Sequence, residues 1–351
     1  MLFTESIQSW RDWARVFQSI PAFTPLAREI CRREGLPWAE LTPLTPGTNG
    51  VFRCGEAVLK IFSPKESGLD PALDFSTELA AARQAASWGV PTPPVLAHGC
   101  LQDKYRFYYI ATRYSPGKEA GPWLRDATPA QQAAFVERLR QLLPQLHRPT
   151  QALPRRDLRQ EARVNFRLEK LAPSLREEVL ARLEGLPLEP AVLTHGDLTG
   201  ENLLVQEDGS FVVIDWADAH LAPAWYELGP LAFELLAGEG RLWRQLAAGA
   251  EELFVERLLD CLCLHDFGPD FLTNLAHRQG RAGFHSLGEV AECLRFQFAG
   301  VAPQASRAKG RRLNAASVRT TSARARRRRV KVSSTFSKVA GELGEAPQRS
   351  W

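Results

Sequence analysis

Long apolar segments are missing from this sequence. It contains no run of about 18 or more apolar residues, so no helix that crosses a membrane is expected. Residues 1–13 include Glu5, Arg11 and Asp12, whereas a secretory signal requires an unbroken apolar stretch at this place. These absences predict an intracellular, cytoplasmic protein with no transmembrane segment.

Patterns for zinc sites and disulfide frameworks are missing as well. The six cysteines include no Cys-x-x-Cys pair, and the seven histidines occur singly, without His-Glu-x-x-His spacing. A zinc site is therefore not expected. Reduced and mostly buried thiols are the simplest interpretation of the cysteines. An isolated histidine is more often a packing or surface residue than a ligand.

Acidic residues are scarce in the last part of the chain. Thirteen of the 44 Lys and Arg residues, but only two of the 40 Asp and Glu residues, lie after residue 306. Residues 1–306 therefore carry a net charge near −7, and the remainder carries a charge near +11. Residues 303–351 also lack apolar periodicity and contain four consecutive arginines at 326–329, which predicts a disordered tail.

The basic tail at 303–351 has more than one interpretation. It is either a solvated segment without a dedicated partner or function, or a segment that binds nucleic acid, another acidic partner or an acidic membrane. Recognition by nuclear import machinery is one form of the second interpretation, and it would add the nucleus to the expected locations. The sequence does not decide between these interpretations.

The rest of the chain divides into three parts by its pattern. Residues 1–40 place apolar residues at helical spacing and predict a helical segment ahead of a sheet. Residues 41–114 predict strands, with a helix over 74–88 that ends at Gly-Val-Pro. Residues 115–302 are mostly helical in pattern. The fold class expected is α+β, with a small antiparallel-sheet N-lobe and a larger helical C-lobe.

A short hairpin within the helical part brings polar residues together. Two apolar stretches at 203–206 and 210–214 are separated by a turn that contains Asp-Gly. Pairing of these strands places Asn202 beside Asp215, and their oxygens suit Mg²⁺, which also keeps water and phosphate ligands. Asp197 lies five residues before Asn202, close enough to face the same metal-bound phosphates.

These residues carry a resemblance to a known family. Residues 195–202 read His-Gly-Asp-Leu-Thr-Gly-Glu-Asn, and residues 214–216 read Ile-Asp-Trp. They resemble the motifs of the aminoglycoside phosphotransferase and choline kinase family, over most of residues 40–300. The resemblance implies a bilobal protein-kinase-like fold that uses ATP and Mg²⁺. It also implies that Asp197 accepts or orients the acceptor's hydroxyl proton, while Asn202 and Asp215 hold the metal.

The predicted N-lobe contains the residues expected to bind the nucleotide. Gly47, Thr48 and Asn49 lie in a segment that resembles the family's nucleotide loop, where backbone N–H groups approach phosphate. Lys60 stands between apolar residues of a strand, so its ammonium needs an anionic partner, and ATP phosphates suit it. Glu78 is either the residue that pairs with Lys60 and directs it or an ordinary surface glutamate.

Further positions complete the resemblance. The family's interlobe hinge, whose backbone would bind adenine, corresponds to Arg113, Tyr114 and Ser115. His147 and His195 are expected to shape the structure. Relatives follow Ile-Asp-Trp with Gly-Asp-Pro and Tyr-Asp-Leu segments, whereas residues 222–228 read Ala-Pro-Ala-Trp-Tyr-Glu-Leu here. We expect Glu227 to replace the Asp that braces the catalytic loop, with a changed local geometry.

Protein kinase activity is not favoured by these motifs. A protein kinase would show His-Arg-Asp, Asp-Phe-Gly and Ala-Pro-Glu, but the chain has Gly196 and Trp216 in the first two motifs and lacks the third. We therefore expect an ATP-dependent phosphotransferase that acts on a hydroxyl of an aminoglycoside-, choline- or sugar-like molecule. The alternative is a catalytically silent, nucleotide-binding scaffold whose basic tail binds nucleic acid or another partner.

The acceptor is less well defined than the reaction. The acidic body slightly favours a cationic acceptor. Acceptor contacts are expected from the helices after Leu228, which carry the candidate carboxylates Glu234, Glu251, Glu252 and Asp260. The sequence leaves open the identity of the acceptor, the choice between ATP and GTP, and the oligomeric state.

Overall fold

The computed structural model describes residues 1–45 and 47–299. The expectations for the tail at 303–351 lie outside these residues. Within the described part of the chain, none of the helices combines the length and the apolar character that crossing a membrane would require.

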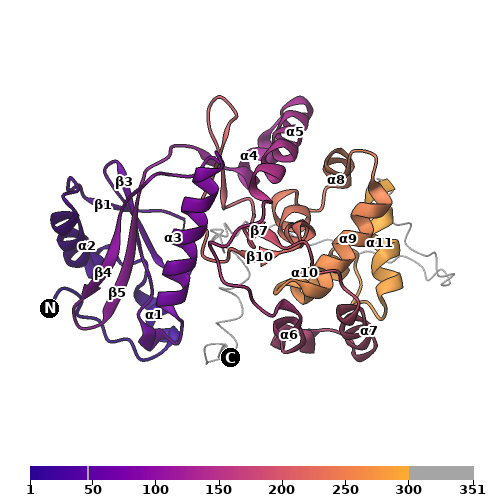
Figure 1. Cartoon of the computed structure of the whole chain (residues 1–351), viewed down its shortest axis with the longest axis horizontal. Helices are drawn as coiled ribbons and strands as arrows, with labels where there is room; N and C mark the ends of the chain where they lie inside the picture. The colour runs from indigo at the N-terminus through magenta and orange to yellow at the C-terminus, as the bar shows by residue number, and fades with distance from the viewer. Residues whose placement is uncertain (46, 300–351) are drawn as a thin grey trace, which may run out of the picture.

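Five antiparallel strands form the N-terminal sheet (Figure 1). Their order is β1-β2-β3-β5-β4, with bounds β1 (Leu41–Pro43), β2 (Gly50–Cys54), β3 (Ala57–Ile61), β4 (Val95–Gln102) and β5 (Arg106–Arg113). Gly55 adopts a left-handed φ of 62° in the tight turn between β2 and β3, where most other residues would be strained. The register pairs Lys60 with Val51 on one side and Ile110 on the other, so Lys60 lies in the central strand.

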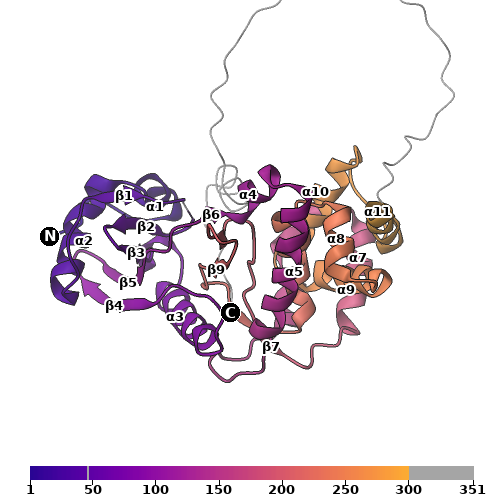
Figure 2. The same cartoon turned by 90° about the horizontal axis from the view of Figure 1, so that it is seen from above.

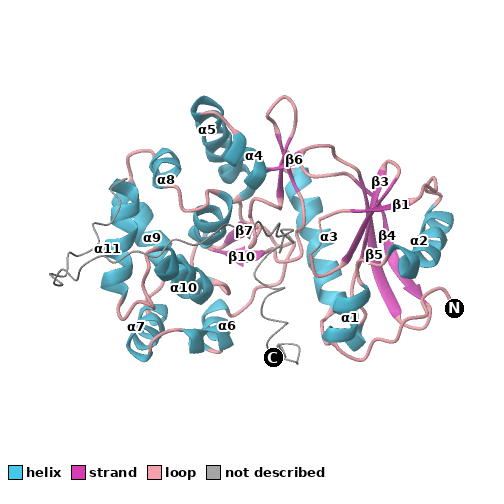
Figure 3. Cartoon of the chain, turned by 180° about the vertical axis from the view of Figure 1, so that it is seen from behind, coloured by secondary structure: helices cyan, strands magenta, loops and turns pink. Residues whose placement is uncertain are grey.

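Helices cover both faces of this sheet. The helix α2 (Ile20–Glu34) and the shorter α1 (Trp10–Val16) contribute apolar side chains to a core shared with β2, β3 and β5. On the opposite face lies α3 (Pro71–Ser87), as Figures 1 and 3 show. In the chain, α3 is preceded by η1 (Lys65–Ser67). The side chain of Asp70 caps α3 by accepting hydrogen bonds from the N–H groups of Ala72 and Leu73.

The remainder of the described chain is mainly helical. Its helices surround one large apolar core, to which α3 also contributes through Ala81, Ala82 and Ala85. They are α4 (Ala120–Asp126), α5 (Pro129–Leu146), α6 (Leu158–Arg163), η2 (Phe166–Lys170), α7 (Pro173–Glu184), η3 (Ala224–Glu227), the π-helix η4 (Pro230–Leu235), α8 (Gly240–Ala247), α9 (Glu251–Leu264), α10 (Gly268–Arg278) and α11 (Leu287–Ala299).

Two small sheets lie where the helical part meets the N-terminal sheet. One pairs β7 (Val192–Thr194) with β10 (His220–Ala222), and the other has the order β6-β8-β9, from β6 (Lys118–Glu119), β8 (Leu203–Val205) and β9 (Phe211–Val213). Figure 2 shows β6 and β9 between the N-terminal sheet and the helices. The predicted hairpin at 203–214 is confirmed, and so is the α+β class with a small sheet and a larger helical part.

Candidate active site

The loop between β7 and β8 has a backbone that only glycine fits at one position. Gly196 has a φ of 81°, and a Cβ atom there would lie 2.3 Å from the carbonyl oxygen of Asp218. The two carboxylate oxygens of Glu227 accept hydrogen bonds from the backbone N–H groups of His195 and Gly196, both at 2.8 Å. The bracing role expected of Glu227 is therefore confirmed.

Two buried histidines hold the same loop from inside. His195 Nε2 lies 3.0 Å from the carbonyl oxygen of Ile214, and its Nδ1 accepts from the N–H of Asp197 at 3.3 Å. These contacts require the tautomer in which Nε2 carries the proton. His265 Nε2 lies 3.0 Å from the carbonyl oxygen of Gly196. The loop is thus fixed at the residues that lead into Asp197.

The carboxylate of Glu227 is ionised although it is buried. It is completely buried, and burial opposes ionisation. The neighbouring His147 ring, whose Nε2 lies 3.7 Å away, and the N–H donors of the loop nevertheless hold the pKa of Glu227 at about 2. A charged carboxylate therefore accepts both loop N–H groups at neutral pH.

The hairpin places the two predicted metal ligands next to each other. The N–H of Ile214 donates to the carbonyl of Asn202 at 3.0 Å, which brings Asp215 beside Asn202. Asp215 has a left-handed φ of 63°, a conformation that Asp tolerates better than most residues. The amide nitrogen of Asn202 donates to the backbone oxygen of Asp197 at 2.8 Å and to its Oδ2 at 2.9 Å. This fixes the amide and leaves its Oδ1, an oxygen donor, for another partner.

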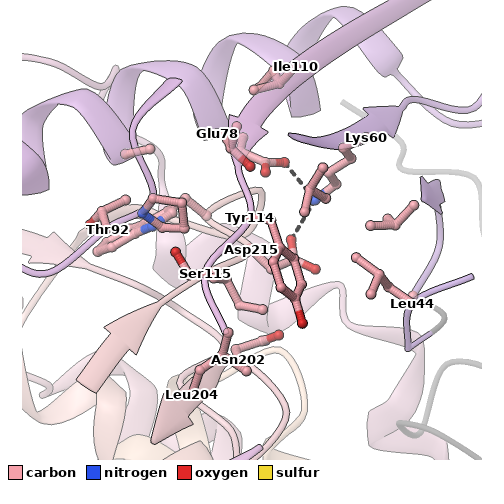
Figure 4. Close-up of a pocket in the computed structure, with 18 of the residues that line it drawn as sticks. Leu44, Lys60, Glu78, Thr92, Ile110, Tyr114, Ser115, Asn202, Leu204 and Asp215 are labelled. Carbon is pink, nitrogen blue, oxygen red and sulfur yellow. Dashed lines mark hydrogen bonds and ion pairs between the residues drawn. The ribbon is translucent and has the colours of Figure 1, made fainter. Parts of the chain in front are cut away.

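Lys60 forms two ion pairs, one within the N-lobe to Glu78 and one across to Asp215 of the C-lobe (Figure 4). Its Nζ lies 2.6 Å from Glu78 Oε2 and 2.7 Å from Asp215 Oδ1. Burial opposes the charge of Lys60, but the two carboxylates raise its pKa above the usual range. Burial raises the pKa of Glu78 to about 7, although Lys60 acts against this, and Lys60 holds the pKa of Asp215 below its usual range despite burial. Glu78 is thus a buried partner of Lys60 and not a surface residue.

Asp197 lies among other carboxylates. Burial and the nearby charges of Asp218 and Asp215 raise its pKa well above the usual range, with a smaller contribution from Glu234. The amide of Asn202 partly offsets this effect. The proton affinity of Asp197 is therefore high for an aspartate, and the local field favours cations.

A cavity of about 320 Å³ lies between the two lobes and contains these groups, within the size range of small-molecule sites. Lys60, Glu78, Asp197, Asn202 and Asp215 all line it, as do the predicted hinge residues Arg113, Tyr114 and Ser115. Apolar side chains from the sheet and from the β8–β9 hairpin complete its walls, among them Leu44, Val51, Val58, Leu204 and Ile214.

The predicted nucleotide loop contributes its residues unequally. Gly47 lines the cavity, and a Cβ atom there would lie 3.9 Å from Asp215 Oδ2. Asn49 is buried instead, where its Oδ1 accepts from the N–H of Ser63 at 3.0 Å. The carbonyl oxygen of Thr48 accepts a hydrogen bond from Trp13 Nε1 at 2.8 Å. The structure therefore places Thr48 and Asn49 at the base of the loop and Gly47 at the cavity.

Three residues at the site have no counterpart among the predictions. His265 supports the loop at Gly196, Trp13 holds the base of the nucleotide loop, and Glu119 accepts a hydrogen bond from the hydroxyl of Thr45, which also lines the cavity. Each contact joins positions at least 35 residues apart. No local motif marks such residues, because a single His, Trp or Glu is common in any sequence.

The donor set fits a cation that keeps water or phosphate ligands. Among residues 1–45 and 47–299, no group of three or more His, Cys, Asp or Glu side chains has the arrangement of a complete metal site. Asp215 and Asn202 instead offer hard oxygens from adjacent backbone positions, which is the partial set that Mg²⁺ uses beside phosphates. The residues present therefore fit Mg²⁺.

This geometry defines the site as one for kinase-like phosphotransfer. Its features are an ion-paired lysine, an aspartate in a braced loop and an Asn/Asp pair within one cleft. A sequence model described as the phosphotransferase enzyme family matches residues 40–282, and the chain belongs to this family. The protein is accordingly a small-molecule phosphotransferase with a protein-kinase-like fold. A search of curated proteins found no match.

Solved structures agree with this fold at low sequence identity. The GDP complex of wild-type aminoglycoside 2'-phosphotransferase-IIIa is 16% identical and superposes with a TM-score of 0.56, over 81% of this chain and 99% of that one. A thermostable mutant of aminoglycoside phosphotransferase APH(4)-Ia in a ternary complex with AMP-PNP and hygromycin B is also 16% identical. It has a TM-score of 0.52, over 79% of this chain and 99% of that one.

Proposed function

We propose that this protein transfers the γ-phosphate of ATP to a hydroxyl group of a small molecule. The observation that carries the proposal is the convergence of Lys60, Asp197, Asn202 and Asp215 on one cavity between the lobes. Together they supply three requirements of phosphoryl transfer: charge neutralisation by Lys60, a proton acceptor in Asp197, and metal ligands in Asn202 and Asp215.

The cavity suits a purine nucleotide. Val51 and Val58 of the sheet, Leu44 just after β1, and Leu204 and Ile214 of the hairpin supply apolar walls for a flat base. In the hinge, the N–H of Arg113 donates to Pro94 and the N–H of Tyr114 donates to Glu56. We therefore assign the base-binding donor to the next N–H along the chain, that of Ser115. Nucleotide complexes of the similar structures, with GDP and AMP-PNP, support this assignment.

Charged side chains in the cavity would position the phosphates of the nucleotide. Lys60 would turn from Asp215 toward the phosphates while Glu78 continues to hold its ammonium. Asp215 would then be released, together with Asn202 Oδ1, to hold Mg²⁺. When bound, Mg²⁺ neutralises phosphate charge during transfer. The Lys60–Asp215 ion pair thus keeps both groups poised in one place before the nucleotide arrives.

Asp197 is the residue that would receive the acceptor's hydroxyl proton. Its raised pKa makes it a better base than an ordinary aspartate, and Asn202 fixes the direction of its carboxylate. The braces from Glu227 and His265 prevent the loop from moving away. Most of the rate would still come from positioning and charge neutralisation, because an aspartate remains a weak base.

The acceptor is proposed to carry a positive charge. Of the four candidate carboxylates, Asp260 is buried against Arg182 and Arg257, and Glu252 pairs with Arg295. Glu234 is the one that contributes to the field at Asp197. Together with Asp218 and Asp197 it favours an amine or quaternary ammonium group on the acceptor. Hygromycin B bound to the similar APH(4)-Ia structure supports an aminoglycoside-like choice.

Nucleotide consumption tests this function directly. The purified protein is incubated with Mg²⁺ and ATP or GTP and a panel of aminoglycosides, choline, sugars and amino alcohols, and release of nucleoside diphosphate is measured. At least one acceptor is expected to stimulate turnover, and Asp215→Ala is expected to abolish it. Nucleotide binding without transfer to any acceptor would instead favour the silent scaffold.

Charge preference for the acceptor is tested at Glu234. Glu234→Gln removes its charge and is expected to raise the KM of a cationic acceptor by about ten-fold without changing the KM of the nucleotide. Glu252→Gln serves as the matched control, because Glu252 pairs with Arg295 away from the cavity. Equal KM values for the two variants would refute the assignment of Glu234.

A further inference from the structure

Residues 1–34 lie outside the family match, which begins at residue 40, but they are bonded closely to the N-terminal sheet. The N–H groups of Leu2 and Phe3 both donate to Asp103 Oδ2 at 2.8 Å. The N–H of Ile7 donates to Tyr105 Oη, also at 2.8 Å. These bonds join the first residues of the chain to the turn between β4 and β5. The N-terminal segment is therefore part of the N-lobe.

Aromatic side chains continue this connection toward the nucleotide loop. Phe3 contacts Phe23 of α2 with ring centroids 5.2 Å apart, and Phe23 contacts Trp13 of α1 at 5.7 Å and Phe52 of β2 at 5.2 Å. These four side chains are fully buried. A Cβ atom on Gly50 would lie 3.1 Å from the carbonyl oxygen of Phe17, so the segment after α1 packs directly on the first residue of β2.

The N-terminal segment reaches the nucleotide loop through a hydrogen bond from Trp13 Nε1 to the carbonyl oxygen of Thr48, at 2.8 Å. The Thr48–Asn49 peptide is trans. In a trans peptide the C=O and the following N–H point in opposite directions. Holding the Thr48 carbonyl toward Trp13 therefore directs the N–H of Asn49 away from α1. The side chain of Asn49 is anchored separately by the N–H of Ser63 at 3.0 Å.

We propose that Trp13 is a positioning residue for the nucleotide loop, and that residues 1–34 support the nucleotide site from outside the cavity although they precede the family match. Trp13 fixes the Thr48–Asn49 peptide so that the backbone N–H groups of the loop remain available to phosphate. This inference rests on the proposed use of a nucleotide. It adds that nucleotide affinity depends on a segment remote in sequence from every catalytic residue.

Removing the hydrogen-bond donor of Trp13 while keeping an aromatic side chain tests this role. Trp13→Phe retains an aromatic side chain but removes the indole N–H, and Trp10→Phe is the matched control on the same helix. Affinity for AMP-PNP with Mg²⁺ is measured by calorimetry, and hydrogen–deuterium exchange is followed in peptides that cover residues 44–52. Trp13→Phe is expected to bind about five-fold more weakly, with faster exchange in the loop, unchanged exchange in α9 and α10, and an unchanged acceptor KM.

The outcomes separate this inference from the proposed function. Equal affinity and equal loop exchange in Trp13→Phe and Trp10→Phe would overturn the role of Trp13 while leaving the kinase function intact. Failure of the wild-type protein to bind AMP-PNP would overturn the proposed function and the nucleotide part of this inference together. Faster exchange throughout Trp13→Phe, including α9 and α10, would show a general loss of packing and would also overturn the specific role.

Discussion

At the scale of single residues, Gly196 has the strictest requirement in the catalytic loop. Its φ is 81°, and a Cβ atom on it would lie only 2.3 Å from the carbonyl oxygen of Asp218, so no side chain fits there. Gly196→Ala is therefore expected to lower the free energy of unfolding by about 2 kcal/mol or more and to reduce turnover strongly. Denaturant unfolding and steady-state kinetics measure the two effects.

Gly283→Ala is the control for this substitution. A Cβ atom on Gly283 meets nothing within 4 Å, and its backbone φ is not left-handed. Its free energy of unfolding is expected to change by no more than about 0.5 kcal/mol. If Gly196→Ala is as stable as Gly283→Ala, the loop does not have the conformation described.

Single residues also show what the sequence could and could not predict. Glu78 could be predicted as a candidate partner of Lys60, because a lysine between apolar residues needs an anionic partner, but a surface glutamate remained the alternative until the structure showed the ion pair. The position of Asn49 was not predictable, because the same loop sequence allows its side chain to face a phosphate or the sheet. Trp13 and His265 reach the site only through tertiary packing, which no local pattern encodes.

At the scale of elements, α3 determines the direction of Lys60 because it carries Glu78 against β3. Glu78→Gln keeps the shape of the side chain but removes its charge. Of its two carboxylate partners, Lys60 then keeps Asp215. The KM for nucleotide is expected to rise by about ten-fold, with a smaller effect on thermal stability. Steady-state kinetics with varied nucleotide measure this change.

The control for this helix is Glu66→Gln, which alters an exposed glutamate in η1, just before α3. Its KM for nucleotide is expected to match that of the wild type. A Glu78→Gln enzyme with the kinetics of Glu66→Gln would show that the orientation of Lys60 does not depend on α3.

Elements differ in how far the sequence predicts them. The β8–β9 hairpin follows from its Asp-Gly turn and two apolar strands, and it is confirmed. The partner of β8 on its other side is β6, which has only two residues and pairs across about 85 positions of sequence. The β7–β10 pair likewise joins three-residue strands on either side of the hairpin. Such short strands have no periodicity of their own and form because the surrounding packing brings them together.

At the scale of the whole molecule, the buried His265 links stability to pH. Burial, with the nearby Arg167, holds its pKa at about 4, although Asp266 and Glu227 act in the opposite direction. The unfolded chain binds a proton near pH 6.5, so this histidine contributes stability that is present above pH 6.5 and is lost as the pH falls toward 4. The stability cost of His265→Gln is therefore expected to shrink by about 1.4 kcal/mol for each pH unit below 6.5.

Denaturant unfolding of wild-type and variant proteins from about pH 7.5 to about pH 5 measures this difference. Groups that titrate in the same range, such as Glu78, act equally in both proteins and cancel from the comparison. The control is His277→Gln, which alters an exposed residue at the end of α10 and is expected to show a constant difference from wild type. A constant difference for His265→Gln would refute the role of burial.

The division into a small sheet and a larger helical part was predictable, because strand and helix patterns occupy separate stretches of the chain. That α1 and α2 cover one face of the sheet was not predictable, because the pattern of an amphipathic helix does not specify which face of a sheet it covers. These helices make the N-lobe a sheet packed between two helical layers (Figure 1). The site therefore depends on the first 34 residues as well as on the segments that carry the motifs.

The proposal that Asp197 performs the chemistry while Lys60, Asn202 and Asp215 hold the Mg²⁺-nucleotide is tested most directly with Asp197→Asn. Nucleotide affinity by calorimetry and single-turnover phosphate transfer to a stimulating acceptor are measured for this variant and for wild type. Asp197→Asn is expected to bind the Mg²⁺-nucleotide with unchanged affinity and to transfer phosphate at least about 100-fold more slowly. Transfer by Asp197→Asn at the wild-type rate would contradict the assignment.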